Sequence, residues 1–224
     1  MFKKDVAAYR EAFQTNGYIN MKDVLDDAFV AHMKSFLASI EAGERDDLEA
    51  NRMPGHKRQY KFEFPSRDDA LEFRDALCTL SGLNAQAAVL SERHLMIYED
   101  TSKPYPYPHK DRAASGLTVG FPIDIPEASA VYVFPDMDRS ENPNEKATYL
   151  SQDEYQDPRK IYDRSDAVCM KDELGDMVVF SGSTIYHARV HPANTAVLYC
   201  KMNDVGRDPL GEDIFQVEAV LERA

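Results

Sequence analysis

The sequence predicts a mainly β protein, an antiparallel sandwich or jelly roll flanked by N-terminal helices. Apolar residues recur at helical spacing up to about Thr79. From about Arg93 onward the apolar residues instead form short alternating or continuous runs, rich in β-branched and aromatic side chains. Helices followed by at least seven short strands fit two packed sheets with the helices outside them.

Three helices are expected in the N-terminal part. The first runs from Asp5 to about Gln14 and is followed by Asn16-Gly17-Tyr18-Ile19, which predicts a turn into a short extended segment. The second spans about Val24 to Ala42, and the third about Arg67 to Thr79. In the second helix the apolar side chains recur at steps of four and three, which places them on one face: Leu25, Phe29, Met33, Phe36 and Ile40. The polar segment from Glu44 to Lys61, with Pro54-Gly55 inside it, predicts a loop.

Pro, Gly, Asp and Ser separate the expected strands. These strands are 94–100, 116–125, 130–135, 167–170, 176–182, 185–190 and 195–202. The segment from about Asp136 to Arg164 has almost no aliphatic residues and is too long for a hairpin. We therefore expect it to be a mobile segment that covers a functional site. We therefore expect one domain: a helical part to residue 85, a jelly-roll core at 86–205 with the insert at 136–164, and a C-terminal tail at 206–224.

The composition restricts the partners. The net charge of −13 would repel nucleic acid and anionic membranes. Cys78, Cys169 and Cys200 lie far apart without metal-site spacing, which is typical of reduced thiols in a cytoplasmic protein. No run approaches the roughly 18 apolar residues of a membrane span. The expected partner is therefore a small molecule, and the oligomeric state stays open.

The first candidate motif for chemistry is His109-Lys110-Asp111. If it forms the start of a strand, residues i and i+2 point the same way, so that the imidazole and the carboxylate converge on one point. Six histidines in so acidic a chain give roughly one such tripeptide by chance. A surface histidine near an aspartate therefore remains an alternative for the bare tripeptide.

The second motif is the run of residues 175–187, in which an apolar strand, a Ser-Gly-Ser turn and a returning strand end on His187. Two imidazoles and one carboxylate on one face form the facial triad suited to Fe(II), O2 and a bidentate co-substrate. His191 is the rival third ligand, but it precedes Pro192, where a loop should begin. The other histidines lack partners at ligand spacing, although His94 could face the pocket; they are His32, His56 and His94.

In three places the chain resembles the phytanoyl-CoA dioxygenase-like branch of the Fe(II)/2-oxoglutarate-dependent oxygenases. They are Phe13-x-x-x-Gly17-Tyr18-Ile19 followed by Val24-Leu25, then His109-x-Asp111, and the run ending at His187. The resemblance implies a cupin-like double-stranded β-helix, an iron held by His109, Asp111 and His187, and 2-oxoglutarate and O2 as co-substrates.

One position departs from this family. Members usually carry an arginine for the far carboxylate of 2-oxoglutarate near the start of the strand after the distal histidine, where this chain has Thr195. A carboxylate in a partly desolvated site still needs a cation. Arg189 is the first candidate because it shares the strand direction of His187, and Lys201 and Arg207 follow. Tyr98 either hydrogen-bonds the co-substrate or fills the barrel.

The resemblance implies a reaction as well. Relatives that halogenate replace the carboxylate ligand with a small residue, so Asp111 favours hydroxylation or a related oxidation such as desaturation. The acidic balance and the lack of a clear basic patch disfavour a CoA thioester, and we expect an amino acid or a natural-product intermediate as substrate. Two alternatives remain: another metal-dependent cupin-type enzyme, and a binding protein that holds Zn(II) or nothing.

Overall fold

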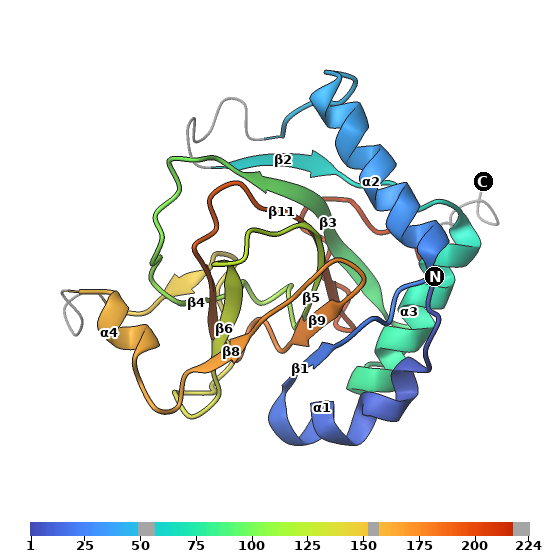
Figure 1. Ribbon diagram of the computed structural model, residues 1–224. Helices are drawn as coiled ribbons and strands as arrows, with labels where there is room; N and C mark the ends of the chain where they lie inside the picture. The colour runs from blue at the N-terminus through green and yellow to red at the C-terminus, as the bar shows by residue number, and fades with distance from the viewer. Residues whose placement is uncertain (49–56, 152–156, 217–224) are drawn as a thin grey trace.

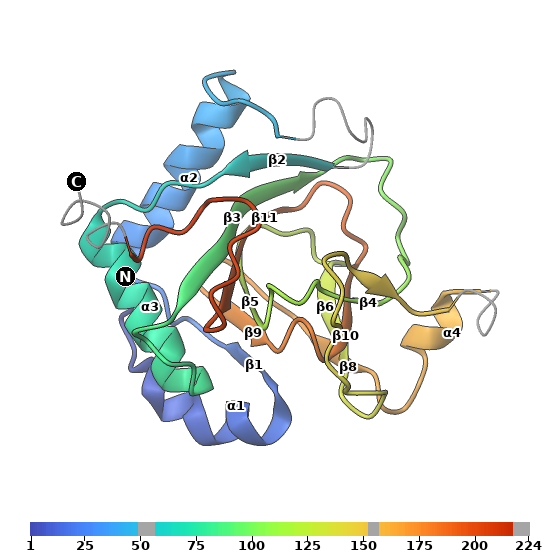
Figure 2. The ribbon, with the colours of Figure 1, turned by 180° about the vertical axis from the view of Figure 1, so that it is seen from behind.

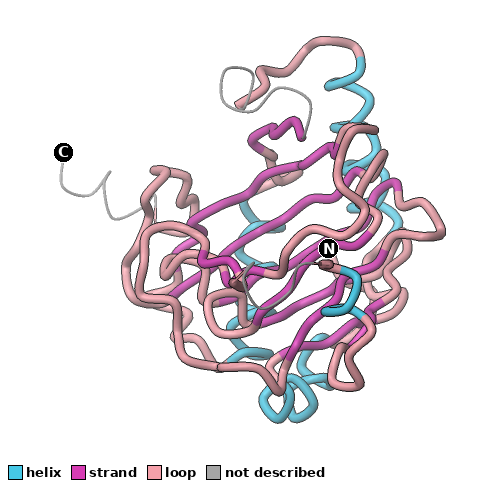
Figure 3. The backbone as a smooth tube through the Cα atoms, turned by 90° about the vertical axis from the view of Figure 1, so that its left-hand side faces the viewer, coloured by secondary structure: helices cyan, strands magenta, loops and turns pink. Residues whose placement is uncertain are grey.

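The computed structural model describes residues 1–48, 57–151 and 157–216, which form two facing antiparallel sheets (Figure 1). The larger sheet has the strand order β1-β9-β5-β11-β3-β2 and the smaller β7-β4-β10-β6-β8. The strands are β1 (Tyr18–Met21), β2 (Lys57–Lys61), β3 (Val89–Tyr98), β4 (His109–Lys110), β5 (Leu117–Asp124), β6 (Ala130–Phe134), β7 (Thr148–Tyr149), β8 (Val168–Met170), β9 (Met177–Phe180), β10 (Tyr186–Val190) and β11 (Ala196–Asn203). The predicted jelly-roll fold is confirmed, and Figure 3 shows the strands lying side by side across the molecule.

The helices cover the outer face of the larger sheet. They are the 3-10 helix η1 (Val6–Tyr9), α1 (Arg10–Asn16), α2 (Asp27–Glu41) and α3 (Arg67–Ser81), while the short α4 (Arg159–Tyr162) lies on the opposite side of the molecule (Figures 1 and 2). Helix α2 begins at Asp27 and not at Val24, because the carboxylate of Asp26 accepts a hydrogen bond from the Phe29 backbone and caps the helix. Its predicted apolar face is buried.

Alternation along β11 explains how one sheet serves both the core and a site. Leu198 and Cys200 belong to the cluster that packs beneath the helices. The alternate residues of the strand face the smaller sheet, and two of them, Tyr199 and Lys201, line a pocket. Because successive side chains of a strand point to opposite faces, burial of the first set under the helices fixes the direction of the second set.

The structure adds detail to two parts of the predicted domain division. The part before residue 85 also contributes two strands to the larger sheet: β1, which agrees with the extended segment expected after Gly17, pairs with β9, and β2, at the end of the segment 44–61 that was predicted to be a loop, pairs with β3. Residues 206–216 of the predicted C-terminal tail are docked, because Glu212 accepts hydrogen bonds from the Arg93 backbone and the His94 ring, at 3.2 and 2.9 Å, and Phe215 is buried. The remaining tail, 217–224, lies outside the described residues.

The predicted insert at 136–164 is exposed over most of its described length, but it is attached to the rest of the molecule at two places. It contributes β7 to the smaller sheet, and Ile161 and Tyr162 of α4 pack in a cluster with Phe134 and Val190. The premise that this segment lacks the apolar residues for docking is therefore wrong, because Ile161 and the ring of Tyr162 supply them. Residues 152–156, and Pro54, Gly55 and His56 of the predicted loop, lie outside the described residues.

No helix in the described part of the chain is long and apolar enough to cross a membrane.

Candidate metal centre

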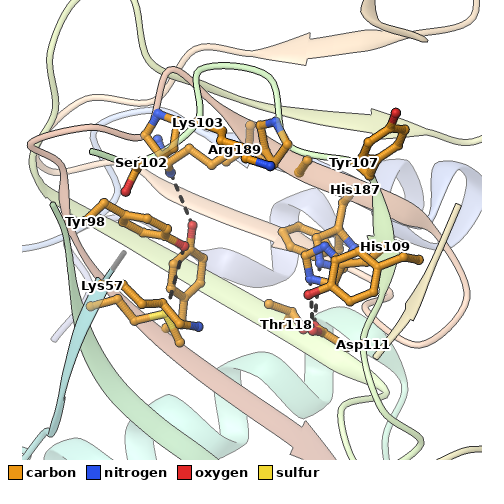
Figure 4. Close-up of a pocket in the computed structure, with 18 of the residues that line it drawn as sticks. Lys57, Tyr98, Ser102, Lys103, Tyr107, His109, Asp111, Thr118, His187 and Arg189 are labelled. Carbon is orange, nitrogen blue, oxygen red and sulfur yellow. Dashed lines mark hydrogen bonds and ion pairs between the residues drawn. The ribbon is translucent and has the colours of Figure 1, made fainter. Parts of the chain in front are cut away.

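Three side chains meet between the sheets: one from β4, one from the residue just after β4 and one from β10 (Figure 4). His109 on β4 lies directly opposite His187 on β10 in the antiparallel ladder, and Asp111 follows the end of β4. The potential ligand atoms of the three residues all lie within 4.8 Å of one another. The Nε2 atoms of His109 and His187 are 3.7 and 3.6 Å from the two carboxylate oxygens of Asp111.

The Asp111 carboxylate is held in place from several sides. Its backbone N–H donates to the carbonyl of Gly182 at 2.8 Å, which joins the end of β4 to the Ser-Gly-Ser turn. The Thr118 hydroxyl donates to Oδ2 at 2.7 Å, and the Lys201 ammonium donates to Oδ1 at 3.1 Å. Burial would raise the pKa of Asp111, but Lys201, His187 and His109 outweigh it and hold the pKa well below its usual value. The carboxyl group is therefore an anion at neutral pH.

The orientation of His187 is fixed by its own turn. Its Nδ1–H donates to the carbonyl of Ile185 at 2.9 Å, so the lone pair is on Nε2, which faces Asp111. Burial, with a further contribution from His109, lowers the pKa of His187 to about 3. The ring is thus neutral at physiological pH. Two imidazole nitrogens and a carboxylate oxygen in this arrangement fit a metal of the iron(II) type with open coordination positions.

We expect Gly182→Ala to impair metal binding although Gly182 offers no ligand atom. A Cβ at this position would collide with the Thr118 hydroxyl, and would lie 2.7 Å from Asp111 Oδ2 and 2.9 Å from the Ser115 carbonyl. The carboxylate must then move, and we expect the affinity for Fe(II) to fall by about tenfold or more. Anaerobic titration of the apoprotein with Fe(II) measures it.

Gly116→Ala is the matched control for this substitution, because the nearest atom to its added Cβ, the Met202 carbonyl oxygen, is an unstrained 3.6 Å away. Equal iron affinities in the two variants would contradict the proposed steric linkage to Asp111.

The candidate centre opens into a pocket of about 420 Å³ between the sheets. This volume is in the range of small-molecule sites in proteins. Tyr98, Tyr199 and Arg189 line the pocket beyond the three candidate ligands, and Figure 4 shows Tyr98 across the pocket from His109.

Solved structures similar to this one share the fold. SnoN, a non-haem alpha-ketoglutarate-dependent epimerase from nogalamycin biosynthesis, matches with a TM-score of 0.60 and 17% identity over 89% of this chain and 80% of its own. HygX from Streptomyces hygroscopicus, solved with nickel, 2-oxoglutarate and hygromycin B, matches with a TM-score of 0.58 and 13% identity over 86% and 85%. A Pseudomonas putida prolyl-4-hydroxylase matches with a TM-score of 0.53 and 14% identity over 88% and 98%.

The chain has the fold of the 2-oxoglutarate-dependent oxygenases. No protein-family model and no curated protein matches its sequence. The phytanoyl-CoA dioxygenase-like branch that the motifs suggest is therefore not confirmed beyond this shared oxygenase fold.

Within this oxygenase fold, Arg189 lies in the pocket but already has a carboxylate partner. Its two terminal nitrogens donate to Asp172 at 3.1 and 2.6 Å, its Nε–H donates to the Tyr199 hydroxyl at 3.2 Å, and Nη1 is 3.3 Å from the Ser129 hydroxyl. Arg189 and Asp172 are both buried. The strand direction expected for Arg189 is observed, but the sequence did not indicate that its charge would be compensated.

Lys201 and Arg207, the other basic candidates, occupy different surroundings. The Lys201 ammonium contacts Asp111 and lies 3.4 Å from Glu92 Oε1. Burial would lower the pKa of Lys201, but Asp111 and Glu92 raise it above its usual value. Arg207 is 3.5 Å from Glu145 in an exposed pair and is not among the lining residues of the pocket.

The other histidines in the described part of the chain are engaged elsewhere. His191 has φ 48° and its ring packs against Tyr105 at 4.8 Å between centroids. His94 lies on the inner face of β3 but hydrogen-bonds with Glu212 and Gln59, and His32 with the Glu63 carbonyl at 2.7 Å. Neither His191 nor His94 belongs to the group of potential metal ligands found in the described part of the chain.

Sequence reasoning missed three residues that shape the site. Thr118 holds Asp111, Asp172 pairs with Arg189, and Tyr149 packs 5.2 Å from the His109 ring centre to centre. Thr118 could have been found, because it stands on an expected strand whose alternation places it on the inner face. Asp172 and Tyr149 lie outside any periodic segment and gave no signal.

Proposed function

We propose that this protein is an Fe(II)- and 2-oxoglutarate-dependent dioxygenase that hydroxylates an unactivated C–H bond of a small molecule, such as an amino acid or a natural-product intermediate. The observation that carries the proposal is the group of His109, Asp111 and His187 at one end of a pocket, in the fold of such oxygenases.

The three residues would hold the iron through two imidazole nitrogens and one carboxylate oxygen. When bound there, iron would supply the chemistry by which O2 decarboxylates 2-oxoglutarate to succinate and CO2 and oxidises the substrate. The chain's own contribution is to place the ligands. Ile185 fixes the tautomer of His187, and Thr118 and Lys201 orient Asp111.

Arg189 is the proposed partner of the far carboxylate of 2-oxoglutarate. It shares the inner face of β10 with His187, two residues away, which places the two Cα atoms about 7 Å apart. Asp172, Ser129 and Tyr199 accept from four of the five guanidinium N–H groups, so one donor has no acceptor among the described residues. The Tyr199 hydroxyl accepts from Nε and hydrogen-bonds with the neighbouring Tyr98, and its proton can turn from Tyr98 to a bound carboxylate. A carboxylate can bind these two donors while Asp172 stays in place.

Lys201 is the weaker candidate for this role. Its ammonium is 3.1 Å from an oxygen of Asp111, beside the proposed metal. The far carboxylate of 2-oxoglutarate, in contrast, must lie several bonds away from the metal. We assign Lys201 to positioning Asp111 instead. Tyr98 lines the pocket next to this region and is a second hydroxyl within it.

Hydroxylation is the proposed outcome because Asp111 supplies the carboxylate ligand that halogenating relatives lack. SnoN is described as an epimerase and SnoK, another match, as a carbocyclase, so this fold also serves other oxidative outcomes.

Anaerobic reconstitution tests the proposed function. Fe(II) and 2-oxoglutarate together are expected to produce the weak visible metal-to-ligand band, and exposure to O2 with a substrate library is expected to release succinate. A protein that binds Zn(II) tightly and never develops the band with Fe(II) would instead be a cupin-like binding protein.

A further inference from the structure

The pocket has a charge opposite to that of the chain. Four basic side chains line it: Lys57, Lys103, Arg189 and Lys201. Asp111 is the one carboxylate among the lining residues that the structure describes, while the whole chain carries −13. The sequence-based expectation that a basic patch is absent is therefore wrong for the pocket, because residues distant in the chain gather there.

Two of these four charges are compensated locally. Arg189 pairs with Asp172, and Lys201 pairs with Asp111. Glu92, which also contacts Lys201, is matched by Arg112 at 3.0 Å. The proposed cofactors do not alter this balance, because the two positive charges of Fe(II) cancel the two negative charges of 2-oxoglutarate. Lys57 and Lys103 then remain as the pocket charges that no described residue compensates.

Neither lysine makes an ion pair or a side-chain hydrogen bond with any part of the chain that is described. Lys57 begins β2 and stands opposite Tyr98 in the ladder, so its side chain shares the pocket face with Tyr98. Lys103 is in the segment that follows β3. Figure 4 shows both lysines across the pocket from the three candidate ligands.

We propose that the substrate of this oxygenase is a small anionic molecule whose carboxylate or phosphate group is bound by Lys57 and Lys103, with its other end at the metal. The proposal rests on the proposed function. Lysine suits either group, because its ammonium is a compact point charge that needs no planar partner. Tyr98, Tyr107 and Tyr149 also line the pocket, which favours an apolar or aromatic body.

Matched acids and amides test the proposal on the anaerobic Fe(II)–2-oxoglutarate complex. Phenylacetate and phenylacetamide differ in charge at nearly constant shape, and phenyl phosphate supplies the phosphate form. The wild type is expected to bind one or both acids at least tenfold more tightly than the amide. In the double variant Lys57→Gln/Lys103→Gln this ratio is expected to fall to about one. In the wild type the preference for acids is expected to weaken as the salt concentration is raised.

Lys34→Gln is the matched control, because Lys34 is exposed on α2, which covers the other face of the larger sheet, and this variant should keep the preference for acids. Three results would overturn the assignment: no acid binds, the amide binds equally well, or the preference survives in the double variant. A tenfold loss of 2-oxoglutarate affinity in the double variant would also overturn it, since the lysines would then serve the co-substrate.

The visible band distinguishes failure of the anionic-substrate proposal from failure of the proposed oxygenase function. A band with no preference for acids would refute only the anionic substrate. Without a band, the titrations are repeated on the metal-free protein, and a retained preference would leave an anion-binding pocket in a protein that is not an oxygenase.

Discussion

His109→Ala, Asp111→Ala and His187→Ala are each expected to abolish iron-dependent turnover and to lower the affinity for Fe(II) by at least two orders of magnitude. Each substitution removes one of only three protein ligands, and the open coordination positions cannot replace it. The fold should survive, because the core beneath the helices and between the sheets does not include these side chains. Iron titration and circular dichroism of the same samples measure the two effects.

His191→Ala is the control for the distal ligand. Its ring contacts Tyr105 and not Asp111, so this variant is expected to retain iron. Loss of iron in His191→Ala together with its retention in His187→Ala would show that the distal ligand is misassigned.

Arg189→Gln is expected to raise the apparent requirement for 2-oxoglutarate by about two orders of magnitude, with little change in iron affinity. Removing one partner of a buried charge pair costs roughly 2–5 kcal/mol, and about 1.4 kcal/mol corresponds to tenfold in affinity. The same substitution leaves Asp172 buried without its cation, so the free energy of unfolding should also fall by roughly 3–5 kcal/mol.

The double variant Arg189→Gln/Asp172→Asn separates the two consequences. It removes both charges, so thermal stability should recover in large part, whereas the affinity for 2-oxoglutarate should stay low. Anaerobic titration of the visible band and a thermal melt measure the two quantities. Recovery of 2-oxoglutarate binding along with stability would mean that Arg189 has a structural role only.

Lys201→Gln is the comparison for the anchor. We expect it to disturb Asp111 and therefore to weaken iron binding, without a separate effect on 2-oxoglutarate at saturating iron. If it gives the large 2-oxoglutarate effect and Arg189→Gln does not, the anchor lies on β11.

Local patterns were enough to predict most of the elements of the fold. The spacing of Phe29, Met33 and Phe36 predicts α2, and all seven expected strands are present, because amphipathic periodicity follows directly from which face each element buries. The extended segment expected after Gly17 is β1, whereas β2 was predicted to be a loop, since it is short, polar and at the edge of the larger sheet. The docking of residues 206–216 depends on Glu212 reaching His94, a contact between segments that share no local pattern.

The sequence by itself determined the identities of the three candidate ligands and the direction of Arg189 along its strand. Only the tertiary structure decided what surrounds them. The ladder between β4 and β10 sets His109 opposite His187, and the turn at Gly182 holds Asp111, which lies beyond the end of β4. Spacing along one strand specifies side-chain direction, but a compensating charge comes from wherever the fold brings another segment. The pairing of Arg189 with Asp172, and the gathering in the pocket of two lysines without a partner among the described residues, therefore could not be predicted from the sequence.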